Sequence, residues 1–197
     1  MPLEIETKFK VLRLDPFRRR LEALGADFAG TVREKNWILD GDKDWLRRRG
    51  VLFRLRDVGN GGVLTVKGPP KDERSGFKTR EEINCRVDSV PAFLLQMEML
   101  EYWPIWIYEK IRESWKWRDC SVELDEFPEI GFFIEIEGDP GRIPAAALDL
   151  GLDPESRINE TYFNIWVKYL DESRQPFRDM VFAGGEGKNL PGKAEAE

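Results

Sequence analysis

Charged side chains recur at every second position in one short segment after another. In residues 3–10, Glu4, Glu6 and Lys8 share one side of the pattern, and apolar residues fill most of the other. Because successive side chains of a β-strand point to opposite faces, this spacing predicts a strand. The same pattern predicts seven further strands, within residues 36–40, 51–57, 62–68, 77–86, 106–113, 121–126 and 132–138. Eight strands can close into a barrel with a small interior.

Four segments carry apolar residues at helical spacing: residues 15–24, 89–101, 142–150 and 158–171. Asp15-Pro16 and Ser89 are typical of helix starts, and Gly25 and Gly151 are typical of helix ends. We expect these helices to cover the outside of the sheet. The predicted fold is therefore α+β, a closed eight-stranded antiparallel β-barrel, or tunnel, with helices packed on the outside.

The composition changes near the end of the chain. From Gly184 onward the sequence is rich in Gly, Lys and Glu and nearly free of apolar residues, which predicts a disordered tail over residues 184–197. Residues 1–175 are long enough for one domain. No segment approaches the roughly 20 apolar residues that a membrane span needs, and the N-terminus shows no secretory signal. We therefore expect a cytoplasmic location and no membrane partner.

The charged faces of the predicted strands form one set. It contains six acids and seven bases: Glu4, Glu6, Glu82, Asp125, Glu135 and Glu137; Lys8, Arg54, Arg56, Lys67, Arg80, Lys110 and Arg112. A sheet with one face in water alternates in the same way, and a charged pair there stabilises it by only about 0.2–1 kcal/mol. A solvent face, however, usually mixes in Ser, Thr, Asn and Gln. Inside a closed barrel so many charges are costly unless they are paired or bind ions, so we interpret them as a binding site.

Both signs of charge in one interior indicate a particular kind of ligand. A triphosphate is a polyanion that arginine binds in a bidentate manner and lysine binds as a point charge. Carboxylates would repel this anion unless a divalent cation lay between them. The chain has no histidine, which excludes imidazole metal sites and leaves oxygen-bound Mg²⁺, Mn²⁺ or Ca²⁺. The net charge of −6 argues against a broad nucleic-acid-binding surface.

The charged pairs also occur as a series of short motifs. The first strand carries Glu4-x-Glu6-x-Lys8. Six further motifs follow in order: Arg54-x-Arg56, Leu64-Thr65-x-Lys67-Gly68-Pro69, Arg80-x-Glu82, Lys110-x-Arg112, Leu124-Asp125 and Gly131-x-Phe133-x-Glu135-x-Glu137. In these motifs the sequence resembles the CYTH superfamily, also called the triphosphate tunnel metalloenzymes. The first motif alone is a weak signal, but the ordered series of seven across residues 3–170 is specific.

The resemblance implies an eight-stranded tunnel, dependence on Mg²⁺ or Mn²⁺, and a small-molecule triphosphate as substrate. By position it assigns metal binding to Glu4, Glu6, Asp125, Glu135 and Glu137. It assigns phosphate binding to Lys8, Arg54, Arg56, Lys67, Arg80, Lys110 and Arg112. Catalysis would rest on Glu4, Glu6, Lys8 and Glu82, and Glu82 would orient Arg80 or a water on the metal.

Two positions depart from the family pattern. Many members have a Tyr in the second strand, where this chain has Ile38. If that Tyr positions the first-strand lysine, Lys8 is oriented differently here. Thiamine triphosphatases carry a Trp just before the first arginine of the third strand, and Leu52 and Phe53 stand there instead. This difference weakens a thiamine-specific function.

Three functions are compatible with such a site. The first is a triphosphatase, in which the bases neutralise charge on the transferring phosphoryl group. The second is a class IV-type adenylyl cyclase that makes cyclic AMP and pyrophosphate from ATP, and the lack of histidine favours hydrolysis over it. The third is a non-catalytic polyphosphate- or nucleotide-binding module, against which the Glu-x-Glu pairs argue.

Four tryptophans surround one predicted hairpin: Trp103, Trp106, Trp115 and Trp117. We interpret them as core, outer wall or a homodimer contact in preference to a nucleobase-stacking site. A Trp that stacked on a base would instead favour ATP as the substrate.

Overall fold

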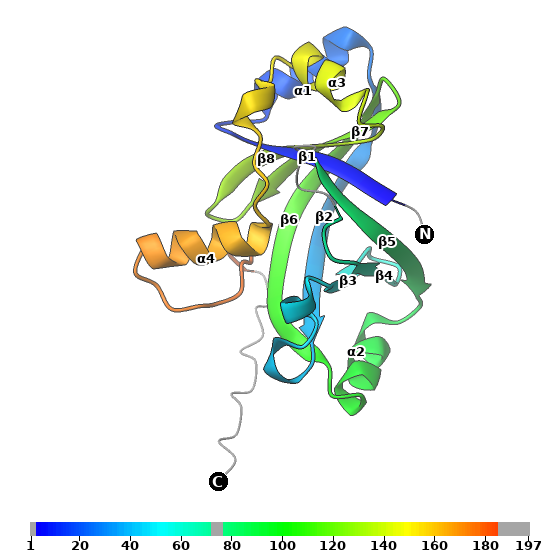
Figure 1. Cartoon of the computed structure of the whole chain (residues 1–197), viewed down its shortest axis with the longest axis vertical. Coiled ribbons are helices and arrows are strands. Elements are labelled where there is room, and N and C mark those ends of the chain that lie inside the picture. The colour runs from blue at the N-terminus through cyan, green and yellow to red at the C-terminus, as the bar shows by residue number, and fades with distance from the viewer. Residues whose placement is uncertain (1–2, 72–76, 185–197) are drawn as a thin grey trace.

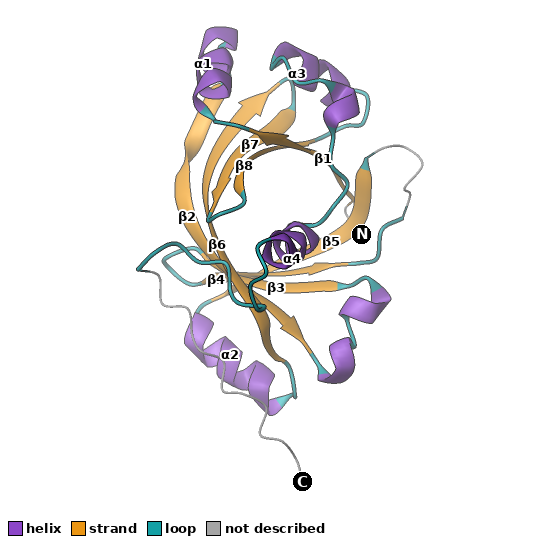
Figure 2. Ribbon diagram, turned by 90° about the vertical axis from the view of Figure 1, so that its left-hand side faces the viewer, coloured by secondary structure: helices purple, strands orange, loops and turns teal. Residues whose placement is uncertain are grey.

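Eight antiparallel strands close into a ring in the computed structural model, which describes residues 3–71 and 77–184. The strands are β1 Leu3–Val11, β2 Asp27–Asp40, β3 Leu52–Asp57, β4 Gly62–Lys67, β5 Lys78–Val87, β6 Trp103–Trp117, β7 Cys120–Phe127 and β8 Gly131–Glu137. They are ordered β1-β5-β4-β3-β2-β6-β7-β8, and β8 pairs with β1 to close the barrel (Figure 2). The predicted fold class is confirmed.

Helices and short turns connect the strands. The α-helices are α1 Asp15–Leu24, α2 Val90–Met99, α3 Ile143–Asp149 and α4 Tyr162–Glu172, and 3-10 turns occur at Asp42–Asp44, Arg47–Arg49 and Pro154–Ser156. The predicted end of α1 and the predicted start of α2 are present, and α2 ends two residues earlier than predicted. Ser89 Oγ accepts a hydrogen bond from the Ala92 N–H at 3.3 Å, and Gly25 ends α1 with a φ of 72°. That left-handed conformation suits glycine, which has no Cβ.

Helices α1, α2 and α3 cover the outer face of the barrel (Figure 1). Leu21 of α1 packs with Val122 and Ile134 of the sheet, and none of the three is exposed to solvent. Helix α2 packs over Leu55 and Ile107 on other strands. Each such buried side chain stabilises the fold by about 1.5–3 kcal/mol. Because the apolar faces are used outside, the alternate charged faces point into the ring.

The second strand is much longer than predicted. It begins at Asp27 rather than at residue 36, and it pairs with β6 along the length of both strands. The register shifts at a bulge between Phe28 and Gly30. Residues 31–35 then pair with β6 in continuous register, but they contain a single apolar residue, Val32, and so lack the alternation that predicts a strand.

Helix α4 is placed differently from the other three. It begins at Tyr162 rather than at residue 158, and Thr161 Oγ1 caps it by accepting from the Asn164 N–H at 3.2 Å. Its buried Trp166 packs in a cluster with Tyr108, on the strand face that also carries the charged residues. The two ribbon views show α4 at one mouth of the barrel, with its first turn toward the ring (Figures 1 and 2).

The packed part of the chain continues past residue 175, where we predicted the domain to end. Met180 is fully buried, and its backbone exchanges hydrogen bonds with Ile107 and Glu109 of β6 at 3.0 and 2.8 Å. The predicted tail, residues 184–197, lies outside the described residues except for Gly184. In the described part of the chain, no helix is long and apolar enough to span a membrane.

Candidate functional site

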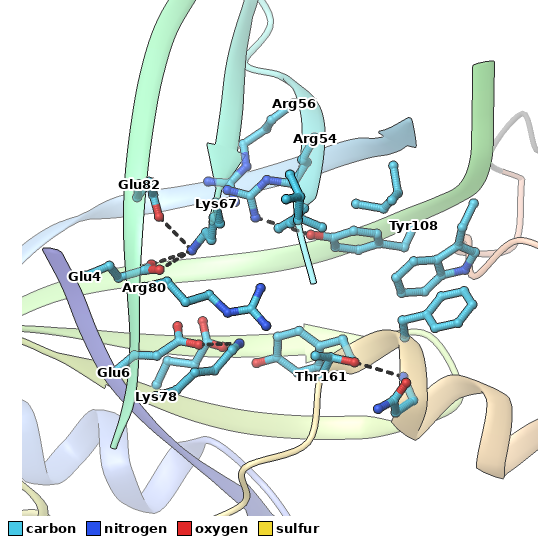
Figure 3. A pocket seen from close by; sticks show the side chains of 18 of the residues that line it. Glu4, Glu6, Arg54, Arg56, Lys67, Lys78, Arg80, Glu82, Tyr108 and Thr161 are labelled. Carbon is cyan, nitrogen blue, oxygen red and sulfur yellow. Dashed lines mark hydrogen bonds and ion pairs between the residues drawn. The ribbon is translucent and has the colours of Figure 1, made fainter. Parts of the chain in front are cut away.

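A cavity of about 540 Å³ lies inside the barrel (Figure 3). Twelve of the thirteen predicted site residues line it: Glu4, Glu6, Lys8, Arg54, Arg56, Lys67, Arg80, Glu82, Lys110, Arg112, Glu135 and Glu137. Among the described residues that line it, nine side chains are cationic and seven are acidic. The cavity is thus locally positive although the chain carries a net charge of −6. Such a cavity attracts anions.

Two lysines hold the acids of β1. The Lys67 Nζ lies 2.5 Å from the Glu4 carboxylate and 2.7 Å from that of Glu82, and the Lys78 Nζ lies 2.7 Å from Glu6 (Figure 3). Burial raises the pKa of Glu4 to about 7 against the opposing effect of Lys67. The acids at this end are therefore incompletely neutralised, because one ammonium group serves two carboxylates.

Asp125, the thirteenth predicted residue, lies behind the cavity wall and is fully buried. Its Oδ2 accepts from Lys110 Nζ at 2.9 Å and from Arg112 Nη2 at 2.6 Å, and its Oδ1 accepts from Arg112 Nε at 2.7 Å. The Tyr162 hydroxyl donates to it as well, at 3.3 Å. Both oxygens of Asp125 thus accept from cationic groups, and the carboxylate fixes Lys110 and Arg112. Its assignment as a metal ligand stays a prediction.

Two guanidinium groups reach the cavity without a carboxylate within ion-pair distance in the part of the chain that the structure describes. Arg54 contacts only hydroxyl groups, those of Tyr108 and Thr65, each at 3.4 Å. Figure 3 shows the Arg80 guanidinium extending into the middle of the cavity. The Nε atoms of Arg54 and Arg80 are buried, and no described residue accepts a hydrogen bond from either. Buried donors are costly when unpaired, so both groups are suited to an anionic ligand.

Two residues of β2, Glu34 and Asn36, hold cationic side chains of the site. Glu34, which is 3% exposed, lies 2.9 Å from Arg56 Nη1 and 3.7 Å from Lys110 Nζ. Asn36 Oδ1 accepts from Arg56 Nε at 3.0 Å. Burial alone would raise the pKa of Glu34, but Lys110 and Arg56 outweigh it and lower the pKa to about 2. Burial and repulsion by Arg54 lower the pKa of Arg56 to about 10.

The lowered pKa of Glu34 predicts an acid-sensitive contribution to stability. The native state binds fewer protons than the unfolded chain, whose carboxyl titrates near 4.5. This contribution is therefore present above pH 4.5 and is lost as the pH falls toward 2. The shift corresponds to a free energy on the order of 3 kcal/mol. We expect Glu34→Gln to lower the free energy of unfolding at pH 7 and to flatten its decline between pH 5 and 3, measured by urea titration.

A matched control for this prediction is Glu22→Gln, which removes an exposed carboxylate from α1. It should leave both the free energy of unfolding and its pH dependence close to those of the wild type. If wild type and Glu34→Gln lost stability in parallel between pH 5 and 3, the acid sensitivity would have another source.

Sequence reasoning missed several residues of the site, among them Glu34, Asn36, Lys78, Tyr108 and Tyr162. Lys78 and Tyr108 each precede a predicted site residue by two positions, so the period-two rule could have included them. Glu34 depended on recognising the long strand, whereas Asn36 begins the predicted strand and carries no charge that would have marked it. Tyr162 had no strand signal, since it lies in the first turn of a helix.

The donor chemistry of the cavity fits a hard divalent cation, because its acids supply only carboxylate oxygens. Strand register places Glu137 opposite Glu6, and Glu4 is two residues away on the same face. Burial raises the pKa of Glu137, so a cation would stabilise its ionised form. Among the described residues, no three such side chains converge on one point, and Lys67 and Lys78 occupy the β1 carboxylates. Glu4, Glu6, Glu135 and Glu137, which all line the cavity, stay the predicted ligands for Mg²⁺ or Mn²⁺.

A second cavity of about 510 Å³ shares Arg54, Arg56 and Glu82 with the first. Its other lining residues include Asp57 and Gly59, beside the turn between β3 and β4. The shared arginines therefore stand between two hollow parts of the barrel interior, as in a tunnel.

The pattern that defines the CYTH domain matches residues 2–162 of the chain. The chain belongs to the CYTH family. The matched region contains all eight strands of the barrel and ends at the first residue of α4. This CYTH chain is also 29% identical over 136 residues to a protein of Methanocaldococcus jannaschii named as a candidate adenylate cyclase. That alignment covers 68% of this chain and 76% of the relative.

Solved structures show the same CYTH fold. A candidate adenylate cyclase from Vibrio parahaemolyticus superposes with a TM-score of 0.74 at 21% identity, over 84% of this chain and 98% of that one. A candidate adenylyl cyclase from Hippeastrum, described as having a dominant triphosphatase activity, gives a TM-score of 0.63 at 18% identity, over 90% and 98% of the two chains. At these identities the likeness concerns the fold.

Proposed function

We propose that this CYTH protein hydrolyses a triphosphate, inorganic or organic, with the help of a divalent metal ion. The observation that carries the proposal is the pair of guanidinium groups, Arg54 and Arg80, that enter the cavity with no carboxylate partner among the described residues. They lie among further cationic side chains in an enclosed space, where charge–charge interactions are stronger than in water. The triphosphatase activity described for the Hippeastrum protein agrees with this proposal.

The chain's own residues would act mainly by orientation and electrostatics. Arginine forks grip phosphoryl oxygens in pairs, so Arg54, Arg56 and Arg80 would fix the phosphate chain along the tunnel. Arg112 and Lys110 are already held in place by Asp125, so they need little reorganisation as charge develops on the transferring group. Preorganised donors of this kind are a large source of rate enhancement.

The acids of β1 and β8 would contribute by binding the divalent ion. A divalent ion held by acids of the set Glu4, Glu6, Glu135 and Glu137 would supply Lewis-acid stabilisation of phosphate charge. The same residues keep like-charged phosphate oxygens away from the acid end when no cation is present. A non-catalytic polyphosphate-binding module would have no use for this arrangement.

Cyclisation of ATP is the second candidate, supported by the name of the Methanocaldococcus jannaschii relative and by one feature of the cavity. Toward α4 the lining becomes apolar and aromatic, with Ile38, Val51, Trp106 and Phe163. A nucleobase would find a suitable surface there. Trp106 is 2% exposed, which agrees with the interpretation as core, but it lines the cavity and so does not belong to the outer wall. The homodimer stays a prediction.

A substrate panel distinguishes these functions. We expect orthophosphate release from tripolyphosphate, ATP or both in the presence of Mg²⁺ or Mn²⁺, and loss of nearly all activity after chelation with EDTA. Products should be identified by chromatography. Cyclic AMP and pyrophosphate as the main products would establish the cyclase, and binding of tripolyphosphate without any product would favour the binding module.

A further inference from the structure

The Lys8 ammonium group contacts a carboxylate, a backbone carbonyl and an aromatic ring at the same time. The Lys8 side chain is nearly buried, at 4% exposure. The Nζ lies 3.2 Å from Glu135 Oε1 and 3.4 Å from the carbonyl oxygen of Glu160. The face of the Tyr162 ring covers the same ammonium group, at 3.7 Å from Nζ to the ring centroid. Two of these three contacts come from the segment that leads into α4.

The Tyr162 ring is held independently of Lys8. Its centroid lies 4.2 Å from that of Phe127 and 5.2 Å from that of Phe133. Its hydroxyl donates to Asp125, the buried counter-ion of Lys110 and Arg112. The ring is thus wedged between apolar neighbours on one side and anchored to a fixed carboxylate at its tip. A cation placed against such a ring is restricted in position as well as stabilised.

The backbone segment before α4 is also hydrogen-bonded to β1. The Ile158 N–H donates to the carbonyl oxygen of Lys8 at 2.7 Å, and Arg157 forms an isolated bridge with Phe9. Lys8 and Tyr162 are therefore fixed relative to one another through the main chain as well as through their side chains. Among the described residues of β2, those that line the cavity are Ile38, Leu39 and Asp40, none of which is aromatic, so the aromatic contact to Lys8 comes from the helix.

We infer that Tyr162 is a positioning residue for Lys8, so that the first turn of α4 forms part of the phosphate-binding wall. The ring keeps the ammonium group directed along the cavity beside Glu135, where it meets a phosphoryl oxygen. The inference rests on the proposed function, in which Lys8 binds phosphate. It also gives α4 a role in the site beyond closing one mouth of the barrel.

The test is a double-mutant cycle between Tyr162 and Lys8, read by kcat/KM for phosphate release from tripolyphosphate with Mg²⁺. We expect Tyr162→Leu, which removes the ring, to lower kcat/KM by about tenfold. Tyr162→Phe keeps the ring and should retain activity within about threefold of the wild type. In a Lys8→Met background, Tyr162→Leu should have little additional effect, because a residue that acts through Lys8 has nothing left to position.

Tyr169→Leu is the matched control on the same helix. Tyr169 stacks on Trp166 and is absent from the cavity lining, so this variant should keep the activity of the folded enzyme. If Tyr162→Leu fails to fold by urea titration, Tyr162→Met replaces it, since methionine keeps apolar volume without a ring.

Two outcomes would overturn the inference. Equal loss of activity in Tyr162→Phe and Tyr162→Leu would show that the ring is not what matters. An undiminished effect of Tyr162→Leu in the Lys8→Met background would show that Tyr162 acts independently of Lys8. If the wild type releases no phosphate, the proposed function fails separately, and the same cycle is then read from the affinity for tripolyphosphate by calorimetry.

Discussion

Replacing Glu4 and Glu6 together by Gln should lower kcat for phosphate release by roughly a thousandfold or more, because the cavity would lose two of the carboxylates that we propose hold the divalent ion. Glutamine keeps the shape and polarity of each side chain, so the barrel should still fold. The change would also free Lys67 and Lys78 from their ion pairs with these acids. Binding of tripolyphosphate without metal should therefore persist or become tighter, as calorimetry would show.

The separation of binding from turnover makes this prediction specific to the metal role. A charge-matched control is the double change Glu81→Gln with Glu126→Gln, which removes two acids from the faces of β5 and β7 that point away from the cavity. These positions are not among the residues that line the cavity, and the control should retain most of the wild-type kcat. Retention of more than about a tenth of the activity by the Glu4 and Glu6 variant would contradict the assignment of these carboxylates to the metal.

The alternation of charge in the sequence was enough to predict the barrel and most of its charged lining. A closed barrel sends every second side chain inward, so a segment such as Arg54-x-Arg56 could be assigned to the interior once its strand was recognised. Twelve predicted residues line the cavity for this reason. The prediction failed where a strand lacked apolar alternation, as in residues 31–35, which contain Glu34.

Two kinds of information were absent from the pattern. Alternation along a strand shows which face a side chain is on, but not how far it extends into the cavity. Asp125 and Glu135 therefore looked equivalent in the sequence, although Asp125 is buried behind the cavity wall and Glu135 lines the cavity. Tertiary placement of a helix is also invisible to strand periodicity. Helical spacing placed Tyr162 on an apolar face, and the sequence contained nothing to bring that face to the mouth of the tunnel.

Asp125→Asn should destabilise the fold by about 3 kcal/mol, because it would leave two cations at a fully buried position without their shared counter-ion. The remaining carboxylates would not fully replace the charge of Asp125. Arg112 keeps Glu135 at 2.5 Å, but the nearest remaining carboxylate to the Lys110 Nζ is that of Glu34, at 3.7 Å. Glu123→Gln is a control on the same strand face. The Ser114 and Ser121 hydroxyls donate to Glu123, which also lies 3.8 Å from Arg112 Nε. Because Glu123 is partly exposed and Gln keeps an acceptor for the serines, this substitution should cost less than about 1 kcal/mol.

The stability of the Asp125→Asn variant should respond to ligand in a way that tests the site as well as the fold. A phosphate chain that reaches Lys110 and Arg112 would supply the negative charge that the substitution removes. Tripolyphosphate should therefore raise the free energy of unfolding of Asp125→Asn more than that of the wild type, since a ligand stabilises in proportion to its binding to the native state. Urea titrations with and without tripolyphosphate measure both increments. Equal increments would mean that the anion does not reach these two cations, and that Asp125 serves the core of the barrel alone.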